Sequence, residues 1–231
     1  MFTARAREAL YDIIRMRRDV RAEFSGEAIR EDALHRVLAA AHHAPSVGNT
    51  QPWDFVVVRD PERLDAFAEH VAGCREAFAD SLPEDKRRTF DPIKVEGIAE
   101  SRTGIVVTYD PSRGGKHILG RHTVDESGLF SAVLAIQNLW LAATAEGLGV
   151  GWVSFYEEEF LRDFVGVEDP VRPIAWLCLG PVTRLQEVPD LERFGWRQGR
   201  PLGEAVHFES WGKHDEGLND ARLPERRDAD V

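Results

Sequence analysis

The chain has 231 residues, of which 43% are hydrophobic and 30% charged, a composition that can build a sizeable core and argues against wholesale disorder. Its formal net charge of −11 argues against nonspecific binding to nucleic acid or to an anionic membrane, so an anionic ligand needs a local cluster of basic residues. The two cysteines lie far apart, Cys178 sits in an apolar run, and the start of the chain has no apolar signal region, so we expect buried thiols in a cytoplasmic protein.

The first predicted element is an amphipathic helix with apolar residues at helical spacing up to Ile14. It runs into residues 15–21, RMRRDVR, which hold four arginines in seven residues. Such a cluster is either a solvated helix end, where arginines complement the helix dipole, or a clamp for a phosphate group, because guanidinium groups match phosphate oxygens. Asp19 lies within the cluster. It either neutralises its neighbours or supplies a carboxylate to the same ligand.

A second helix over about residues 29–41 leads into a loop, residues 44–53, that is rich in polar turn-forming residues, proline and glycine. Ser46 and Gln51 in this loop offer hydrogen-bonding groups. They are either ordinary turn residues or groups that face a heterocyclic ligand.

A strand over residues 54–59 and a further helix follow, after which residues 73–92 change in character because charge is high and apolar content is low. This stretch is either a lid over a site or a surface excursion. We then expect a helix over about residues 93–101, carrying Lys94, and a buried strand over residues 105–109.

The central element is a helix that begins near Leu129 and is apolar almost all the way round, a pattern typical of a helix enclosed by protein. Polar residues interrupt it and Glu146 ends it, whereas a membrane span needs about 20 apolar residues, so we expect a core helix. Three glycines within residues 147–151 lead into a buried strand that reaches Ser154. Glycines in series allow either the approach of a planar cofactor or tight packing of the backbone.

The remaining chain adds a short helix, residues 157–166, and an apolar strand, residues 174–179, and it becomes polar after about Trp211, where we expect poor order. Helices and strands alternate without regular βαβ spacing, which predicts an α+β fold with a sheet flanked by helices. The sequence lacks a nucleophile elbow, a Walker-type phosphate loop and a CxxC pair, and nothing near His42-His43 completes a set of metal ligands. We therefore expect no metal site.

Four motifs occur together and in order. They are RRDVR (17–21), APSVGNTQPW (44–53), AIQNLWLAATAEGLGVGWVS (135–154) and GWRQGRPL (195–202). Together they resemble the FMN-dependent nitroreductase superfamily and, within it, the 5,6-dimethylbenzimidazole synthase (BluB) family. The resemblance covers roughly residues 11–202.

This resemblance implies a nitroreductase-like α+β fold with a central mixed or antiparallel sheet, in a homodimer with exchanged C-terminal arms and one FMN at each subunit interface. It implies one FMN domain over residues 1–211, with 73–92 as a candidate lid, and a polar tail over 212–231. It also implies that the enzyme uses O2 to fragment reduced FMN into 5,6-dimethylbenzimidazole, the lower ligand of cobalamin, and erythrose 4-phosphate. FMN is then a substrate, and a separate flavin reductase supplies it in reduced form.

By motif position, the resemblance assigns the chemistry to Asp19 and Ser154. Asp19 would act as a base on the ribityl hydroxyls, Ser154 would hydrogen-bond the flavin ring, and the arginines would grip the phosphate. The expected FMN-binding residues are Arg17, Arg18, Asp19, Val20, Arg21, Ser46, Gln51, Lys94, Gly151, Ser154 and Arg197.

The loop before Gln51 departs from the synthase pattern, because Asn49 is closer to ordinary nitroreductases and a bulkier apolar pair is missing. Two alternatives therefore stay open. One is an NAD(P)H-dependent reductase of nitro compounds or quinones in which FMN survives many turnovers. The other is a flavin-binding protein without chemistry.

Overall fold

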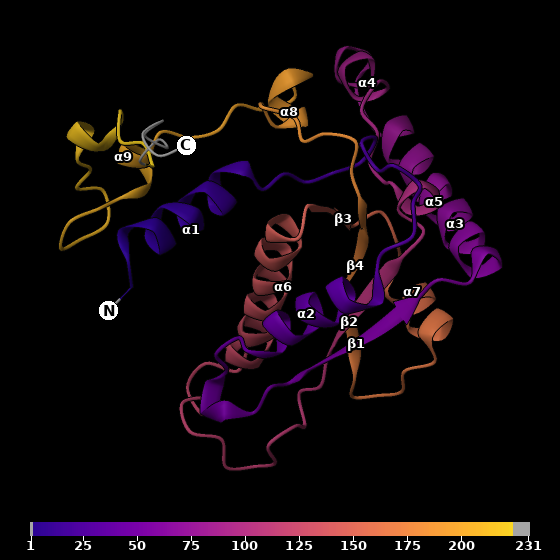
Figure 1. Ribbon diagram of the computed structural model, residues 1–231, viewed down its shortest axis with the longest axis horizontal. Coiled ribbons are helices and arrows are strands. Elements are labelled where there is room, and N and C mark those ends of the chain that lie inside the picture. Colours follow the sequence, from indigo (N-terminus) through magenta and orange to yellow (C-terminus); the bar gives the residue numbers. More distant parts are fainter. Residues whose placement is uncertain (1, 224–231) are drawn as a thin grey trace.

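The computed structural model describes residues 2–223 (Figure 1). Its centre is an antiparallel four-stranded sheet with the strand order β1-β2-β4-β3. The strands are β1 (Trp53–Val58), β2 (Gly104–Tyr109), β3 (Leu148–Val153) and β4 (Arg172–Pro181). The helices are α1 (Ala4–Met16), α2 (Glu31–His42), α3 (Pro61–Asp80), α4 (Glu84–Phe90), α5 (Ile98–Ser101), α6 (Ser127–Ala145), α7 (Glu158–Val165), α8 (Asp190–Arg193) and α9 (Leu202–Ala205), with short 3-10 helices η1 (Val47–Asn49) and η2 (Glu216–Leu218). The predicted α+β fold is confirmed.

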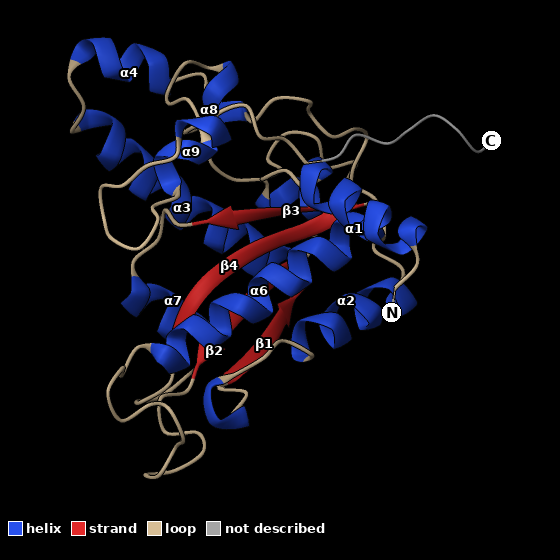
Figure 2. Ribbon diagram, turned by 90° about the vertical axis from the view of Figure 1, so that its left-hand side faces the viewer, coloured by secondary structure: helices blue, strands red, loops and turns tan. Residues whose placement is uncertain are grey.

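Helices cover both faces of the sheet. On one face α2 and α6 pack against alternate residues of β2, among them Ile105 and Val107, and Figure 2 shows these two helices lying across the strands. On the other face Val106 joins a second cluster in which Phe67 of α3 stacks on Trp176 of β4 at 3.8 Å between ring centroids. β2 is therefore buried on both sides, which explains its uninterrupted apolar run.

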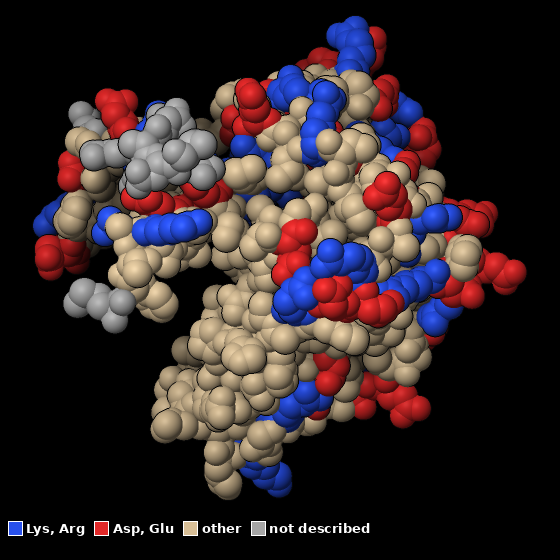
Figure 3. All heavy atoms as spheres, in the orientation of Figure 1, with Lys and Arg blue, Asp and Glu red and all other residues tan. Residues whose placement is uncertain are grey.

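The central helix α6 is confirmed, but the expectation that protein encloses it is wrong for the single chain. One side of α6 packs into the core, whereas Phe130, Val133 and Leu134 are 55%, 41% and 46% exposed. Figure 3 shows few charged side chains on the surface over this part of the molecule. Among the described residues α6 is also the one helix long and apolar enough to span a membrane, and its packing against α2, β2 and β3 is that of a core helix. An all-round apolar pattern cannot tell whether the chain itself or a partner covers the outer side.

The N-terminal segment joins the sheet after α1 ends. α1 buries none of its residues and lies away from the sheet (Figure 1). Beyond it the chain is extended, and the backbone N–H of Val20 donates to the carbonyl of Val150 in β3 at 2.9 Å. A Cβ atom on Gly151 would lie 2.2 Å from the Val20 carbonyl oxygen. The glycines of β3 therefore admit this backbone segment, which shows tight packing at Gly151, whereas contact of these glycines with a planar cofactor stays a prediction.

The predicted helix over residues 93–101 is wrong in its first half, because α5 begins only at Ile98. Ile93 and Val95 are both buried and alternate with Lys94, which is the period of an extended segment. Lys94 therefore does not lie on a helix. Residues 73–92 are also more helical than predicted, since α3 continues to Asp80 and α4 begins at Glu84.

Both cysteines are free, and burial raises the pKa of the Cys178 thiol to about 11, as expected of a structural thiol. The polar tail is partly ordered, because η2 packs beside α9 and the space for a Cβ atom on Gly203 is taken by Asn219. Residues 224–231 of the predicted tail lie outside the described residues, and the division at residue 211 stays a prediction.

Candidate functional site

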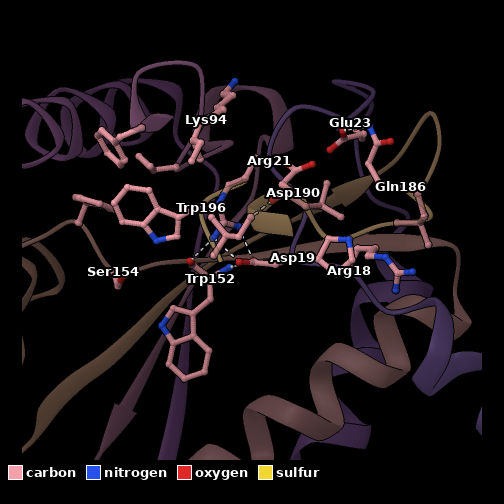
Figure 4. Close-up of a pocket in the computed structure, with 18 of the residues that line it drawn as sticks. Arg18, Asp19, Arg21, Glu23, Lys94, Trp152, Ser154, Gln186, Asp190 and Trp196 are labelled. Carbon is pink, nitrogen blue, oxygen red and sulfur yellow. Dashed lines mark hydrogen bonds and ion pairs between the residues drawn. The ribbon is translucent and has the colours of Figure 1, made fainter. Parts of the chain in front are cut away.

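A cavity of about 410 Å³ opens beside the end of β3 (Figure 4). Its walls come from segments that are far apart in the sequence. The residues that line it include Arg18, Asp19, Arg21, Glu23, Phe78, Phe90, Lys94, Trp152, Ser154, Arg184, Gln186 and Trp196. The structure thus brings the RRDVR motif, Ser154 and Lys94 to one place, as the resemblance implied.

Asp19 is held rigidly at this cavity. Its Oδ1 accepts hydrogen bonds from Arg21 Nη1 at 2.6 Å and from the backbone N–H of Trp152 at 2.9 Å, and its Oδ2 accepts one from Arg21 Nη2 at 2.6 Å. The pairing of Asp19 with Val150 fixes the backbone as well. The Asp19 side chain remains 48% exposed, so a well-oriented carboxylate faces the cavity.

Arg21 is occupied by the protein itself. Besides Asp19, Nη2 donates to the carbonyl of Trp152 at 2.6 Å and Nη1 to the carbonyl of Val20 at 3.0 Å, and Arg21 is only 9% exposed. Contact of Arg21 with a phosphate stays a prediction, but this geometry gives the side chain another task. It positions Asp19 and ties the N-terminal segment to β3.

Arg17 and Arg18 stand at the end of α1. The guanidinium carbon of Arg17 lies 5.2 Å from the centroid of the Trp140 ring, and the Trp140 indole donates to the carbonyl of Arg18 at 3.0 Å. Burial, and then the charge of Arg17, hold the pKa of the Arg18 guanidinium below its usual value. Nη1 of Arg18 donates to the carbonyls of Arg15 and Arg17, whereas its Nε is buried without a hydrogen-bond partner in the described structure. An unsatisfied cationic donor beside a cavity suits an anionic ligand.

Ser154 and Lys94 complete the expected set in the cavity. Ser154 follows directly after β3 and is exposed, so its hydroxyl is accessible to a ligand. Lys94 lines the opposite part of the cavity, and its ammonium group pairs with Glu100.

Ser46 and Gln51 lie elsewhere. Ser46 Oγ accepts from the backbone N–H of Gln51 at 2.9 Å, so it organises its own loop. That loop is anchored to Ser131 near the start of α6, whereas Arg18 is anchored to Trp140, nine residues further along. This spacing corresponds to roughly 14 Å along the helix axis. One chain therefore holds the predicted ligand contacts in two separate groups.

Three further expected contacts, Arg17, Gly151 and Arg197, do not line the cavity. Gly151 is buried beneath the N-terminal segment, and Val20 next to it lines the wall in its place. Arg197 is exposed. Its neighbour Trp196, in the same GWRQ motif, is the residue that lines the cavity. Roles for Gly151 and Arg197 in ligand binding stay predictions.

The sequence alone did not identify the aromatic wall or the polar groups of residues 184–186. Phe90 lies 5.1 Å from Phe78 and 6.0 Å from Trp196 between ring centroids, and the Lys86 ammonium group stands 5.8 Å from the Trp196 ring. The candidate lid thus supplies apolar rings to the cavity. No sequence motif pointed to Arg184, which follows the end of β4 at Pro181.

No group of three or more potential metal ligands occurs among residues 2–223. The cavity combines aromatic walls, an arginine-rich end and a fixed carboxylate. This combination suits a planar aromatic ligand that carries an anionic group.

The fold is that of the nitroreductase-like proteins. A crystal structure of oxidized iodotyrosine deiodinase, bound to FMN and 3-iodo-L-tyrosine, superposes with a TM-score of 0.69 at 20% identity, covering 87% of this chain and 100% of that one. A BluB-like flavoprotein from Clostridium difficile 630 gives a TM-score of 0.65 at 22% identity, covering 87% of this chain and 99% of that one. Both likenesses concern the fold.

Residues 14–181 match the model of the Nitroreductase family, and the chain belongs to that family. At 37% identity over 201 residues, which is 87% of this chain and 95% of the relative, it is similar to the 5,6-dimethylbenzimidazole synthase of Rhodospirillum rubrum. The predicted family is thereby confirmed.

Proposed function

We propose that the protein is an enzyme that makes 5,6-dimethylbenzimidazole by fragmenting reduced FMN, with O2 as the co-substrate. The single observation that carries this proposal is Asp19, a carboxylate fixed by Arg21 and by the Trp152 N–H at the mouth of an aromatic-walled cavity. Similarity to a synthase over most of both chains supports the same reaction.

FMN fits the residues that line the cavity. Arg18 of the RRDVR segment, whose buried Nε has no hydrogen-bond partner among the described residues, suits its phosphate. Arg184 also reaches the cavity, and its side chain makes no hydrogen bond or ion pair with any described residue. The rings of Trp152, Phe90 and Trp196 supply flat apolar walls for an isoalloxazine. When bound in reduced form, FMN supplies the electrons for reaction with O2.

Asp19 would take protons from hydroxyl groups of the ribityl chain. Its Oδ1 already accepts two hydrogen bonds, whereas Oδ2 accepts one, so Oδ2 has the free lone pair. A base must lie within hydrogen-bond reach of the proton it abstracts, and a carboxylate held by three donors keeps that geometry. The exposed hydroxyl of Ser154 would orient the ring edge at the same cavity.

Water exclusion would come from the lid over residues 73–92. Phe78 and Phe90 line the cavity from α3 and α4 and continue into an aromatic cluster with Phe155. Burying the reaction under these rings strengthens the hydrogen bonds inside and protects reactive species from solvent.

A homodimer would complete the site. The exposed apolar side of α6 is a surface that a second copy covers by a two-fold contact, and such a contact brings the partner's loop over residues 46–51 to the arginine end of this chain's cavity. α1 and the segment from α8 to α9 project from the sheet (Figure 1), as arms that exchange between subunits would. A separate flavin reductase and a cytoplasmic location belong to the same proposal.

One observation favours the second candidate, an NAD(P)H-dependent nitro or quinone reductase. Asn49 lies exposed with a positive φ of 55° in the loop over residues 46–51, where ordinary nitroreductases carry asparagine.

The test uses protein loaded with FMN, reduced by light under nitrogen and then exposed to air, with chromatography of the products. The benzimidazole forms without nicotinamide if the synthase assignment is correct. Intact FMN together with repeated NADH oxidation in the presence of a nitroaromatic compound would instead support the reductase.

A further inference from the structure

Glu23 is a buried carboxylate at the cavity that the proposed chemistry does not use. It is 7% exposed and lines the same wall as Asp19. Among residues 2–223 its side chain has one hydrogen-bond partner, Gln186, whose Nε2 donates to Glu23 Oε1 at 2.7 Å. No described residue forms an ion pair with it.

Three of the four cations that line the cavity are committed to other groups, and the fourth, Arg184, forms no ion pair with Glu23. Arg21 forms its ion pair with Asp19, and Lys94 forms its own with Glu100. Both Nη atoms of Arg18 donate to backbone carbonyls. A carboxylate that is buried without a cation is costly unless hydrogen-bond donors satisfy it, and Gln186 satisfies only one of its oxygens.

Backbone pairing sets the position of Glu23 beside Gln186. The N–H of Thr183 donates to the carbonyl of Glu23 at 2.9 Å, and Phe24 forms an antiparallel bridge with Val182. Gln186 follows three residues after Thr183 in the same segment. Figure 4 shows the Glu23 and Gln186 side chains meeting at one wall of the cavity. The pair is therefore built into the fold before any ligand arrives.

Together the two side chains present acceptors and no free cation. Gln186 Nε2 is directed at Glu23, so the amide oxygen of Gln186 and Oε2 of Glu23 remain as acceptors. Acceptors of this kind match hydroxyl groups and repel phosphate oxygens. Both lie on the two segments that also carry Arg18 and Arg184, the residues suited to the phosphate. These two acceptors therefore face hydrogen-bond donors in the part of the ligand that adjoins its phosphate.

We propose that Glu23 and Gln186 form a subsite that binds the hydroxyl groups of the sugar-alcohol chain of the flavin. This inference rests on the proposed function, because it takes a flavin as the occupant of the cavity. Glu23 would then help to select a ligand with a ribityl chain, whereas Asp19 acts on the hydroxyl groups of that chain.

The experiment compares binding of oxidised FMN, riboflavin and lumiflavin by fluorescence titration. Riboflavin lacks the phosphate, and lumiflavin lacks both the phosphate and the sugar-alcohol chain. We expect Glu23→Gln to raise the Kd for FMN and riboflavin about tenfold, since hydrogen bonds to a charged acceptor are lost, and to leave the Kd for lumiflavin unchanged. Glu27→Gln removes the same charge at an exposed position and should change none of the three affinities.

An equal rise in the Kd of Glu23→Gln for lumiflavin and riboflavin would overturn the subsite. An unchanged Kd for riboflavin would overturn it as well. If Glu23→Gln does not fold, as judged by thermal unfolding, Gln186→Met is used instead, because Gln186 is only partly buried and methionine has a similar size. It should weaken riboflavin and spare lumiflavin. Failure of the wild-type protein to bind FMN would contradict the proposed function itself, whereas wild-type binding with an unaffected variant contradicts only the subsite.

Discussion

Asp19 and Arg21 act as one unit. The guanidinium group of Arg21 reaches both carboxylate oxygens of Asp19 and also two backbone carbonyls, so it fixes the carboxylate and the path of the chain together. The RRDVR motif predicted a basic ligand clamp, in which every arginine was expected to face a phosphate. In the structure both Arg18 and Arg21 line the cavity, but Arg21 is engaged with Asp19 and two backbone carbonyls, whereas Arg18 keeps a buried Nε without a partner among the described residues.

Replacement of Asp19 by asparagine should separate binding from chemistry. An asparagine has nearly the same shape and can still accept from the Trp152 N–H, so we expect FMN affinity within severalfold of the wild type. Product formation should fall at least about 100-fold, the usual contribution of a positioned base. The measurement is a single-turnover product assay alongside an FMN titration. A variant that makes product at the normal rate would show that Asp19 is not the base.

Replacement of Arg21 by alanine should weaken the fold more than FMN binding. It leaves the Asp19 carboxylate and the Trp152 carbonyl without their donors in a partly solvated place, so the free energy of unfolding should drop by about 1–3 kcal/mol. Denaturant unfolding measures this change. Arg88→Ala breaks an exposed ion pair with Glu84 and should cost no more than about 0.5 kcal/mol. Equal losses in the two variants would contradict the positioning role of Arg21.

At the scale of elements, the contact between the N-terminal segment and β3 controls the site. Asp19, Trp152 and Ser154 come from these two stretches, and their separation depends on how closely the backbones approach. Gly151 allows that approach, because a Cβ atom there would lie 2.5 Å from Arg21 Nη1 and even closer to the Val20 carbonyl oxygen.

Gly151→Ala should therefore displace the segment that carries Asp19. We expect a loss of about 1–3 kcal/mol in the free energy of unfolding, as for overpacking, together with reduced product formation. Gly73→Ala in α3 is the matched control, because a Cβ atom there meets nothing within 4 Å. Alanine in a helix should stabilise the protein by up to about 1 kcal/mol relative to glycine. Thermal unfolding and product assays of both variants measure these effects. If Gly151→Ala changed neither stability nor product formation, close packing at Gly151 would not be required.

Periodicity predicted most elements of the fold, because the apolar patterns of β1, β2, β4 and α6 follow from burial of each element alone. It failed at residues 93–97, where a short extended segment with two buried residues, Ile93 and Val95, resembles a helix start. The site was predictable only where one motif held several of its residues. Glu23 and Gln186 meet through backbone pairing of distant segments, and no local pattern records such a pairing.

At the scale of the whole molecule, the residues predicted to bind FMN fall into two groups, and within one chain these groups lie apart. Ser46 and Gln51 belong to the loop at the start of α6, and Arg18 belongs to the opposite end of that helix. The exposed apolar residues of α6 lie between these groups. The second copy that we propose on this surface would account for both the exposed side of α6 and the separation of the contacts.

Leu134→Glu should disrupt the proposed dimer. A charge on this 46% exposed apolar residue would be buried without a partner at the interface, so we expect a monomer by light scattering and a weaker affinity for FMN, since the partner's loop is lost. Ala72→Glu introduces the same charge on an exposed position of α3, on the other face of the sheet, and should leave the dimer intact. A monomeric wild-type protein that binds FMN tightly would contradict this assembly.

The most direct test of the account is a stoichiometric one. Wild-type protein carrying reduced FMN is exposed to O2 in the absence of any nicotinamide, and both the flavin's visible absorbance and the amount of 5,6-dimethylbenzimidazole are followed. We expect that the flavin absorbance of the wild-type protein does not return and that one benzimidazole appears for each FMN lost, whereas the Asp19→Asn variant should return to oxidised FMN. Full return of the absorbance in the wild-type protein, with no benzimidazole formed, would contradict it.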